Sequence, residues 1–275
     1  MNKYLPKIIG FFLNIVSYIA PQYAAKIAVQ IFSTPQTGKL TSIETEYLKS
    51  AIQEDIIYNK FHIKTYHWKG KKGTILLAHG WESNTYRWKD LIDLLKTHDY
   101  NIIALDAPAH GASGNKTFNA LLYSECICKV AKRFNASIII GHSVGGMSSV
   151  FFQYNYKLPY VEKLVLLGTP ANFLGVLKHY VIMMGYSERV IRSINQYITK
   201  HFNHPPEYFS ASNFSKDIAI KGLIIHDKKD RIISYKDGLL FKQNYINSKF
   251  IDTKGFGHAL KSDKIYQYIL EFINA

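Results

Sequence analysis

Residues 141–145 read Gly-His-Ser-Val-Gly and follow a β-branched, apolar run at residues 138–140. This order predicts a sharp turn from a buried strand into a helix, with the hydroxyl of Ser143 raised above the sheet edge. The flanking glycines fit such a turn, because a Cβ there would collide with the neighbouring strand or helix. Ser143 is therefore a candidate nucleophile, and the amide N–H of Val144 is a candidate donor to an oxyanion. A purely structural glycine turn is the alternative.

A serine hydroxyl reacts only when a base takes its proton and a third group orients that base. His258 stands in a glycine-flanked segment after the last predicted strand, where the loop can turn back over the carboxyl edge of a sheet. Asp230 lies in the loop beyond the preceding strand, and we favour it as the acid. Asp227, at the end of that strand, stays open as the second candidate. The sequence thus predicts that Ser143, His258 and Asp230 converge in space.

Alternating strand and helix patterns would position these residues. Residues 55–68 are β-branched and aromatic with partial alternation, which predicts one or two antiparallel edge strands. The other predicted strands are residues 74–78, 101–105, 137–140, 163–167, 222–225 and 250–251. The predicted helices between and after them are residues 86–97, 118–134, 144–156, 237–241 and 263–274. Apolar strands joined by helical crossovers indicate an α/β fold whose mostly parallel sheet is covered on both faces.

A long insertion interrupts this rhythm after residue 170. Residues 172–185 and 187–201 have helical patterns, so we predict a helical cap insertion over residues 171–218. The α/β core then comprises residues 54–170 and 219–275. Residues 1–53 are predicted to form an N-terminal helical segment that packs on this core. Its second helix runs from Pro21 to Phe32 and its third from a capping box of Thr41 and Glu44 to about Ile52.

The first helix of that segment carries an apolar stripe at helical spacing, formed by Leu5, Ile8, Phe12, Ile15 and Ile19. The apolar run at residues 8–20 is too short to span a bilayer, and Tyr18 and Pro21 argue against a cleaved signal peptide. We expect the stripe to pack on the domain. Peripheral contact with a membrane interface is the alternative.

Composition and charge bear on the class of partner and on the location of the protein. The chain has 34 Lys and Arg against 20 Asp and Glu, a formal charge of +14 that favours anionic surfaces. The basic residues are scattered, however, so we expect no nucleic-acid partner. Cys126 and Cys128 lie two apart in a predicted helix and cannot pair, so the chain gives no sign of an oxidising compartment and a cytoplasmic protein is expected. Membrane association through the first helix is the alternative. The oligomeric state is left open by the sequence.

Histidines near residue 204 suggest a metal site only superficially. His201, His204 and Glu207 lie beside Pro205 and Pro206 in an irregular segment, and no fourth ligand is evident. We therefore expect no metal, and the predicted chemistry needs no cofactor. His79 and His110 are expected to bond loop backbones, and His142 to point away from the nucleophile.

Five stretches together resemble one known family. They are LLAHGW (residues 76–81), DAPAHGASG (106–114), GHSVGG (141–146), HDKKDRII (226–233) and GFGHAL (255–260). Each follows or ends a predicted strand, in the order expected of the α/β-hydrolase family, which the chain resembles from about Phe61 to the C-terminus. The resemblance implies an eight-stranded, mostly parallel sheet and hydrolysis through an acyl-enzyme. Ala109 departs from the pattern, since the family often has glycine there.

The resemblance also implies further site residues. The amide of Trp81 would be the second oxyanion donor, with His79 and Gly80 in the same substrate-contacting loop. The insertion resembles the lids of monoacylglycerol-lipase-like and lysophospholipase-like esterases. Most of an apolar set in the insertion is expected to form the cap's own core, with Phe173, Met183 and Met184 as candidate contacts to an apolar acyl group. The set is Phe173, Leu174, Leu177, Tyr180, Met183, Met184 and Tyr186.

The predicted function is a serine hydrolase that cleaves small ester or lipid-like substrates. The same triad would serve an amide or thioester hydrolase, which is one alternative. A catalytically silent α/β-hydrolase fold that binds a membrane surface is the other.

Overall fold

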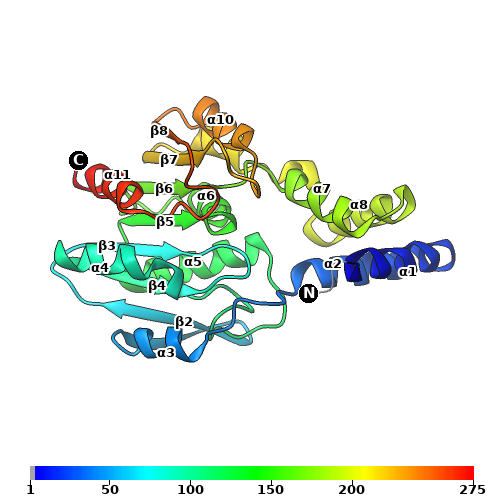
Figure 1. Ribbon diagram of the computed structural model, residues 1–275, viewed down its shortest axis with the longest axis horizontal. Coiled ribbons are helices and arrows are strands. Elements are labelled where there is room, and N and C mark those ends of the chain that lie inside the picture. The colour runs from blue at the N-terminus through cyan, green and yellow to red at the C-terminus, as the bar shows by residue number, and fades with distance from the viewer. Residues whose placement is uncertain (1–3) are drawn as a thin grey trace. The chain divides into compact units, whose positions relative to one another are not determined.

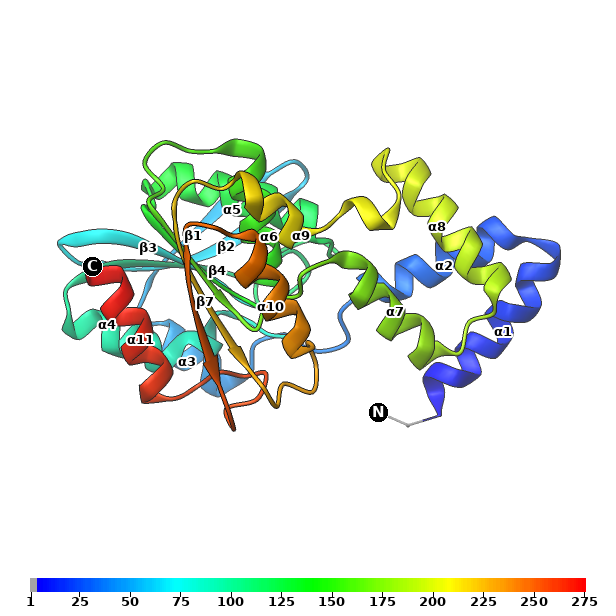
Figure 2. The same cartoon turned by 90° about the horizontal axis from the view of Figure 1, so that it is seen from above.

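The computed structural model describes residues 4–275, and the chain forms two compact units (Figures 1 and 2). The α/β unit consists of residues 35–171 and 211–275. The helical unit consists of the N-terminal residues through Thr34 together with residues 172–210.

The α/β unit contains one sheet of eight strands in the order β1-β2-β4-β3-β5-β6-β7-β8. Strand β2 is antiparallel to β1 and β4, and all other neighbours are parallel. The strands are β1 (Ile52–Tyr58), β2 (Phe61–Trp68), β3 (Lys72–Ala78), β4 (Tyr100–Leu105), β5 (Ile138–His142), β6 (Lys163–Leu167), β7 (Lys221–Asp227) and β8 (Ser248–Thr253). The predicted mostly parallel sheet with an antiparallel edge is confirmed.

Helices cover both faces of this sheet, with α3, α4 and α11 on one face and α5, α6 and α10 on the other (Figure 2). They are α3 (Ser42–Leu48), α4 (Lys89–Thr97), α5 (Ala120–Phe134), α6 (Val144–Tyr156), α9 (Ala211–Phe214), α10 (Tyr235–Asn244) and α11 (Asp263–Asn274), with the 3-10 turns η1 (Thr85–Trp88) and η3 (Ser215–Asp217). The inner strands are almost wholly buried because both of their faces are covered.

The predicted capping box opens α3. Thr41 Oγ1 accepts the N–H of Glu44, and the Glu44 carboxylate accepts the N–H of Thr41 at 2.7 Å. The helix nevertheless ends at Leu48, earlier than expected, because Ile52 already pairs with His67 at the start of β1.

The helical unit joins segments that are far apart in the sequence. Its elements are α1 (Leu5–Ile19), α2 (Pro21–Ser33), α7 (Phe173–Met184), α8 (Glu188–Phe202) and the 3-10 turn η2 (Pro206–Tyr208). Three fully buried alanines, Ala24, Ala25 and Ala28, let α2 pack closely against α8. The sequence predicts one segment over residues 1–53, whereas the structure groups α1 and α2 with α7 and α8, and α3 with the α/β unit.

The orientation of α1 differs from the expectation. Its buried residues are Gly10, Leu13 and Ser17. The predicted packing stripe is exposed instead, from 43% at Leu5 to 92% at Ile19. The face of α1 that packs within the helical unit is therefore not the predicted stripe. Within residues 4–275, no helix combines the length and apolar character needed to cross a bilayer.

Candidate active site

Ser143 occupies the sharp turn between β5 and α6. Its backbone has φ 54° and ψ −127°, in a region that non-glycine residues rarely adopt. The Ser143 N–H donates to the Leu167 carbonyl at 2.8 Å, which ties the turn to the end of β6. A side chain at Gly145 would overlap the Ala78 carbonyl. The chain can therefore make this turn only because the neighbouring position lacks a Cβ.

His258 and Asp230 meet directly. The Nδ1–H of His258 donates to Asp230 Oδ2 at 2.8 Å, and Asp230 Oδ1 accepts the amides of Ile232 and Ile233 at 2.8 and 2.9 Å. Burial acts to raise the pKa of Asp230, but the bond to His258 and the two amides hold that pKa below its ordinary value. Asp230 is thus an ionised acceptor that orients the imidazole ring of His258.

Asp227 has a different set of partners. Its carboxylate accepts the amides of Lys229 and Phe256 at 2.8 and 2.9 Å and the hydroxyl of Thr253 at 2.8 Å. Burial acts to raise the pKa of Asp227, yet these hydrogen bonds hold it below its usual range. Asp227 thereby holds the loop that follows β8, and none of its hydrogen bonds within residues 4–275 reaches His258. Of the two candidate acids, Asp230 is the one beside His258.

The end of β6 brings the serine turn and the His258–Asp230 pair close together. Leu167 accepts the Ser143 amide, and the next residue, Gly168, has φ 53°. A Cβ at Gly168 would lie 3.3 Å from His258 Nδ1 and 3.5 Å from Asp230 Oδ2. The Ser143 hydroxyl makes no hydrogen bond with His258 or with any other residue in the range 4–275. Such bonds often tighten only when substrate is bound.

The two predicted oxyanion donors are free. Neither the Trp81 nor the Val144 amide has a hydrogen-bond acceptor among the described residues. For Val144 this follows from its place in the first turn of α6, where helix amides have no intrahelical partner. Gly80, just before Trp81, lies against the serine, since a Cβ there would sit 2.9 Å from Ser143 Cβ and 3.0 Å from His142 Nδ1.

His79 and His110 bond loop backbones, as expected. His79 donates to the Gly80 carbonyl at 2.8 Å and accepts the Ala107 amide at 2.9 Å. His110 donates to the Pro108 carbonyl and accepts the Glu82 amide. Burial lowers the pKa of both rings to about 4, so each is neutral and keeps one donor and one acceptor. His79 is fully buried with both nitrogens occupied, which argues against the predicted substrate contact.

His142 packs against the loop that carries His258. Its Nε2–H donates to the His258 carbonyl at 2.8 Å, and the two rings lie 4.8 Å apart. Burial, with the nearby Arg87 and His258, holds the pKa of His142 well below its ordinary value. Arg87, also buried, donates to the Ala259 carbonyl at 2.9 Å. His142, Arg87 and Asp227 thus hold successive points of the His258 loop, and sequence spacing gave no signal for the first two.

Comparisons with known proteins agree with this architecture. A family model described as the alpha/beta hydrolase family matches residues 75–224, more than half of the chain. The chain belongs to the α/β-hydrolase family. Among solved structures, this α/β hydrolase resembles alpha/beta hydrolase domain-containing protein 10 from mouse, with a TM-score of 0.64 and 15% identity over 82% of this chain and 97% of that one. This likeness concerns the fold.

Two curated relatives carry functional names. The chain is 25% identical, over 53% of its length, to a pimeloyl-[acyl-carrier protein] methyl ester esterase of Vibrio atlanticus. It is 36% identical, over 34% of its length, to a serine hydrolase-like protein of Danio rerio. The matched stretches span 55% and 30% of those relatives' own lengths.

The three predicted acyl-contacting residues lie in the helical unit of this α/β hydrolase. Phe173 packs edge-on against Phe32 and Phe209, with centroids 6.0 and 6.4 Å apart. Met184 is buried and Met183 is 48% exposed. As expected, most of the apolar set is internal, namely Leu177, Tyr180, Met184 and Tyr186. Contact of Phe173, Met183 or Met184 with an acyl group stays a prediction.

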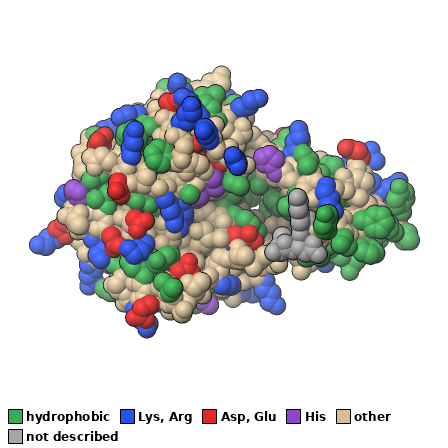
Figure 3. Space-filling view, viewed as in Figure 1, with side chains coloured by type: hydrophobic (Ala, Val, Ile, Leu, Met, Phe, Trp, Pro, Cys, Tyr) green, Lys and Arg blue, Asp and Glu red, His purple; other side chains and the backbone are tan. Residues whose placement is uncertain are grey.

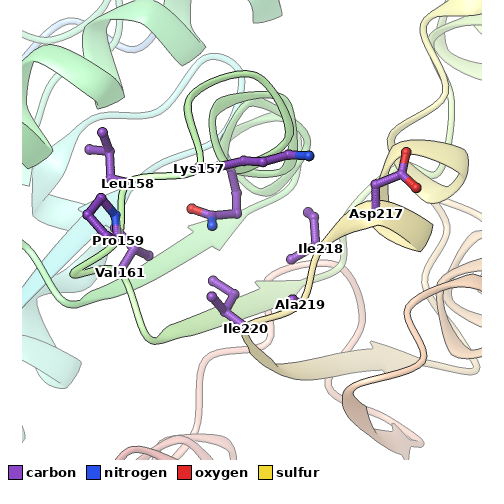
Figure 4. Close-up of a pocket in the computed structure, with 9 residues that line it drawn as sticks. Lys157, Leu158, Pro159, Val161, Asp217, Ile218, Ala219 and Ile220 are labelled. Atoms are coloured by element: carbon purple, nitrogen blue, oxygen red, sulfur yellow. The ribbon is translucent and has the colours of Figure 1, made fainter.

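A cavity of about 210 Å³ lies at the far end of α6 from Ser143 (Figure 4). It is lined by Gln153, Lys157, Leu158, Pro159, Val161, Asp217, Ile218, Ala219 and Ile220. These residues border the starts of β6 and β7, whereas Ser143 follows the carboxyl end of β5. The cavity is therefore separate from the candidate active site. Over residues 4–275, no three His, Cys, Asp or Glu side chains are grouped to hold a metal ion.

Proposed function

We propose that this α/β hydrolase is a serine hydrolase that cleaves carboxylic esters, with apolar acyl groups, through an acyl-enzyme. The 2.8 Å bond between His258 and Asp230, beside the strand end that holds the Ser143 amide, is the observation that carries the proposal. The name of the Vibrio relative supports the same bond class, since it describes a methyl ester esterase.

In the proposed reaction, Ser143 Oγ attacks the ester carbonyl carbon while His258 Nε2 takes the hydroxyl proton. The carbonyl oxygen becomes an oxyanion that accepts hydrogen bonds from the Trp81 and Val144 amides. Asp230 stabilises the imidazolium. The C–O bond to the alcohol then breaks, and the proton on His258 passes to the leaving oxygen. Water repeats the same steps on the acyl-enzyme and releases the carboxylic acid, which restores the serine.

The experiment is covalent labelling with a fluorophosphonate probe, which reacts with activated serines. Ser143→Ala should abolish labelling, because the nucleophile is removed. Ser148→Ala, one turn further along α6, is the matched control. Its buried hydroxyl has no hydrogen-bond partner among the described residues, so its loss should leave labelling intact. Labelling that persists in Ser143→Ala would refute the assignment.

A substrate panel decides between the related activities. Short esters, long esters, acyl thioesters and aminoacyl anilides can be compared with the purified protein. The proposal expects the highest kcat/KM on an ester with a long acyl chain. A preference for a thioester or anilide would replace the ester assignment while keeping Ser143. No turnover and no labelling would indicate a silent fold.

A further inference from the structure

The outward side of α1 is apolar. Seven large side chains on it are between 43% and 92% exposed, namely Leu5, Ile8, Phe11, Phe12, Ile15, Tyr18 and Ile19. Their spacing of three and four residues places them on one continuous face of the helix. Figure 3 shows hydrophobic side chains gathering over α1, at the right of the view.

Polar contacts fix which side of α1 faces inward. Asn14 donates to the Gly185 carbonyl at 2.9 Å and accepts the Ser187 amide at 2.8 Å, so it clamps the turn between α7 and α8. Lys7 donates to the Ile182 carbonyl at 2.9 Å. Helix α1 also crosses the end of α7 at Gly10, where any side chain would overlap a backbone carbonyl. The helix therefore cannot rotate its apolar face inward without breaking these bonds.

Such a helix is inverted relative to the usual surface helix, whose polar side meets water. Each large apolar side chain left in water forgoes the favourable free energy of burial. Contiguous apolar patches of this kind on a folded protein mark contact surfaces. We therefore expect the exposed face of α1 to contact an apolar surface outside the helical unit.

The net charge of the helical unit identifies the partner. No Asp or Glu precedes Glu44 in the chain, and the segments 1–34 and 172–210 together contain seven basic and two acidic residues. The guanidinium of Arg189 lies 4.4 Å from the ring centroid of Tyr18, at the edge of the face. Tyrosine at such an edge suits the boundary between lipid and water. A surface with an apolar interior and an anionic rim complements this arrangement.

We propose that the exposed face of α1 inserts into the headgroup region of an anionic lipid bilayer, with the helix axis parallel to the membrane plane. A bilayer fits better than a second copy of the chain. Two copies meeting through α1 would bring together two units that each carry seven basic residues and only two carboxylates, so like charges would repel. The proposal is independent of the chemistry at Ser143.

The test is sedimentation of the full-length protein with vesicles. One set contains phosphatidylglycerol and phosphatidylcholine in equal parts, and the other contains phosphatidylcholine alone. Wild type should bind the anionic vesicles more tightly than the neutral ones. The double variant Phe11→Ser/Phe12→Ser removes two rings that are each 60% exposed, so folding is kept, and binding should weaken about a hundredfold. Circular dichroism verifies the fold.

The matched control is Ile57→Ser/Ile246→Ser, which removes two side chains of the α/β unit that are 68% and 83% exposed. It should bind as wild type does, and so should Ser143→Ala. Equal binding of wild type to both vesicle types, or of the Phe11/Phe12 variant and the control, would overturn the proposal. So would a wild-type dimer in analytical ultracentrifugation that the Phe11/Phe12 variant disperses.

Discussion

Two carboxylates stand close to one another in this chain, and their partners separate their roles. One carboxylate oxygen of Asp230 accepts a hydrogen bond from His258, and the other accepts two backbone amides. Both oxygens of Asp227 accept hydrogen bonds from the end of β8 and the loop that follows it. The first is placed to act on the imidazole during a reaction, whereas the second holds the loop on which the imidazole stands.

Exchange of these carboxylates for amides should therefore have different effects. In Asp230→Asn the neutral amide cannot stabilise an imidazolium, and we expect kcat to fall by about 10⁴ with KM little changed. Asp227→Asn should keep part of kcat but lower the free energy of unfolding by about 1–3 kcal/mol, because buried amides lose their acceptor. Ester hydrolysis and urea denaturation measure the two. Loss of turnover in a stable Asp227→Asn, with an active Asp230→Asn, would reverse the assignment.

The candidate catalytic residues could be predicted where their position after a predicted strand indicates their place in the fold. The Gly-x-Ser-x-Gly turn, His258 and Asp230 each follow a predicted strand, so their common edge was foreseeable. His142 and Arg87 hold the His258 loop through contacts 116 and 172 residues away in the chain. No local pattern reports contacts of that range.

At the scale of elements, the loop after β4 shows how a departure from the family pattern is accommodated. Ala109, at the position where the family resemblance leads one to expect glycine, adopts φ 68°. The buried Asp106 carboxylate fixes the loop by accepting the amides of Thr85 and Ala112 at 2.9 and 2.8 Å. The turn therefore forms with Ala109 in the left-handed conformation, which is unfavourable for alanine.

Ala109→Gly should raise the free energy of unfolding by about 0.5–1 kcal/mol. The left-handed conformation costs alanine about 1–2 kcal/mol, and the greater freedom of glycine in the unfolded chain cancels part of the gain. Urea denaturation measures the change. Ala112→Gly in the same loop, where φ is not positive, should instead be destabilising. A loss of stability in Ala109→Gly would show that the strain is relieved elsewhere.

Element types and most boundaries followed from periodicity. The predicted bounds of α6, α11 and β6 coincide with the structure, because strong patterns end there at glycine, serine or charged residues. The burial of α1 did not follow. Periodicity shows that a helix has an apolar side, but not whether that side meets protein or another phase.

At the scale of the whole molecule, buried neutral histidines link stability to pH. The pKa values of His79 and His110 are lowered to about 4 by burial, and that of His142 is lowered in the same direction. The unfolded chain, with histidine near pKa 6.5, therefore binds more protons than the folded protein between about pH 4 and 6.5.

The free energy of unfolding should accordingly rise with pH from about 4 to 6.5 and level off above pH 7. Each of these histidines contributes about 1.4 kcal/mol per pH unit in that window. Urea denaturation at a series of pH values measures the slope, and His110→Gln, which keeps one donor and one acceptor, should reduce it. The depressed pKa values of Asp227 and Asp230 act in a lower window, because their contribution is lost only below about pH 4. A pH-independent stability between 4 and 6.5 would contradict this account.

The two-part origin of the helical unit limits how its segments can be exchanged between related proteins. Its two halves are encoded before residue 35 and after residue 171, yet Ala24 and Ala28 of the first half are buried in packing shared with the second. A chimera that takes the helical insertion from a related hydrolase must therefore also take the matching helices α1 and α2. The two segments form one structural module, although 137 residues of the α/β unit separate them in the sequence.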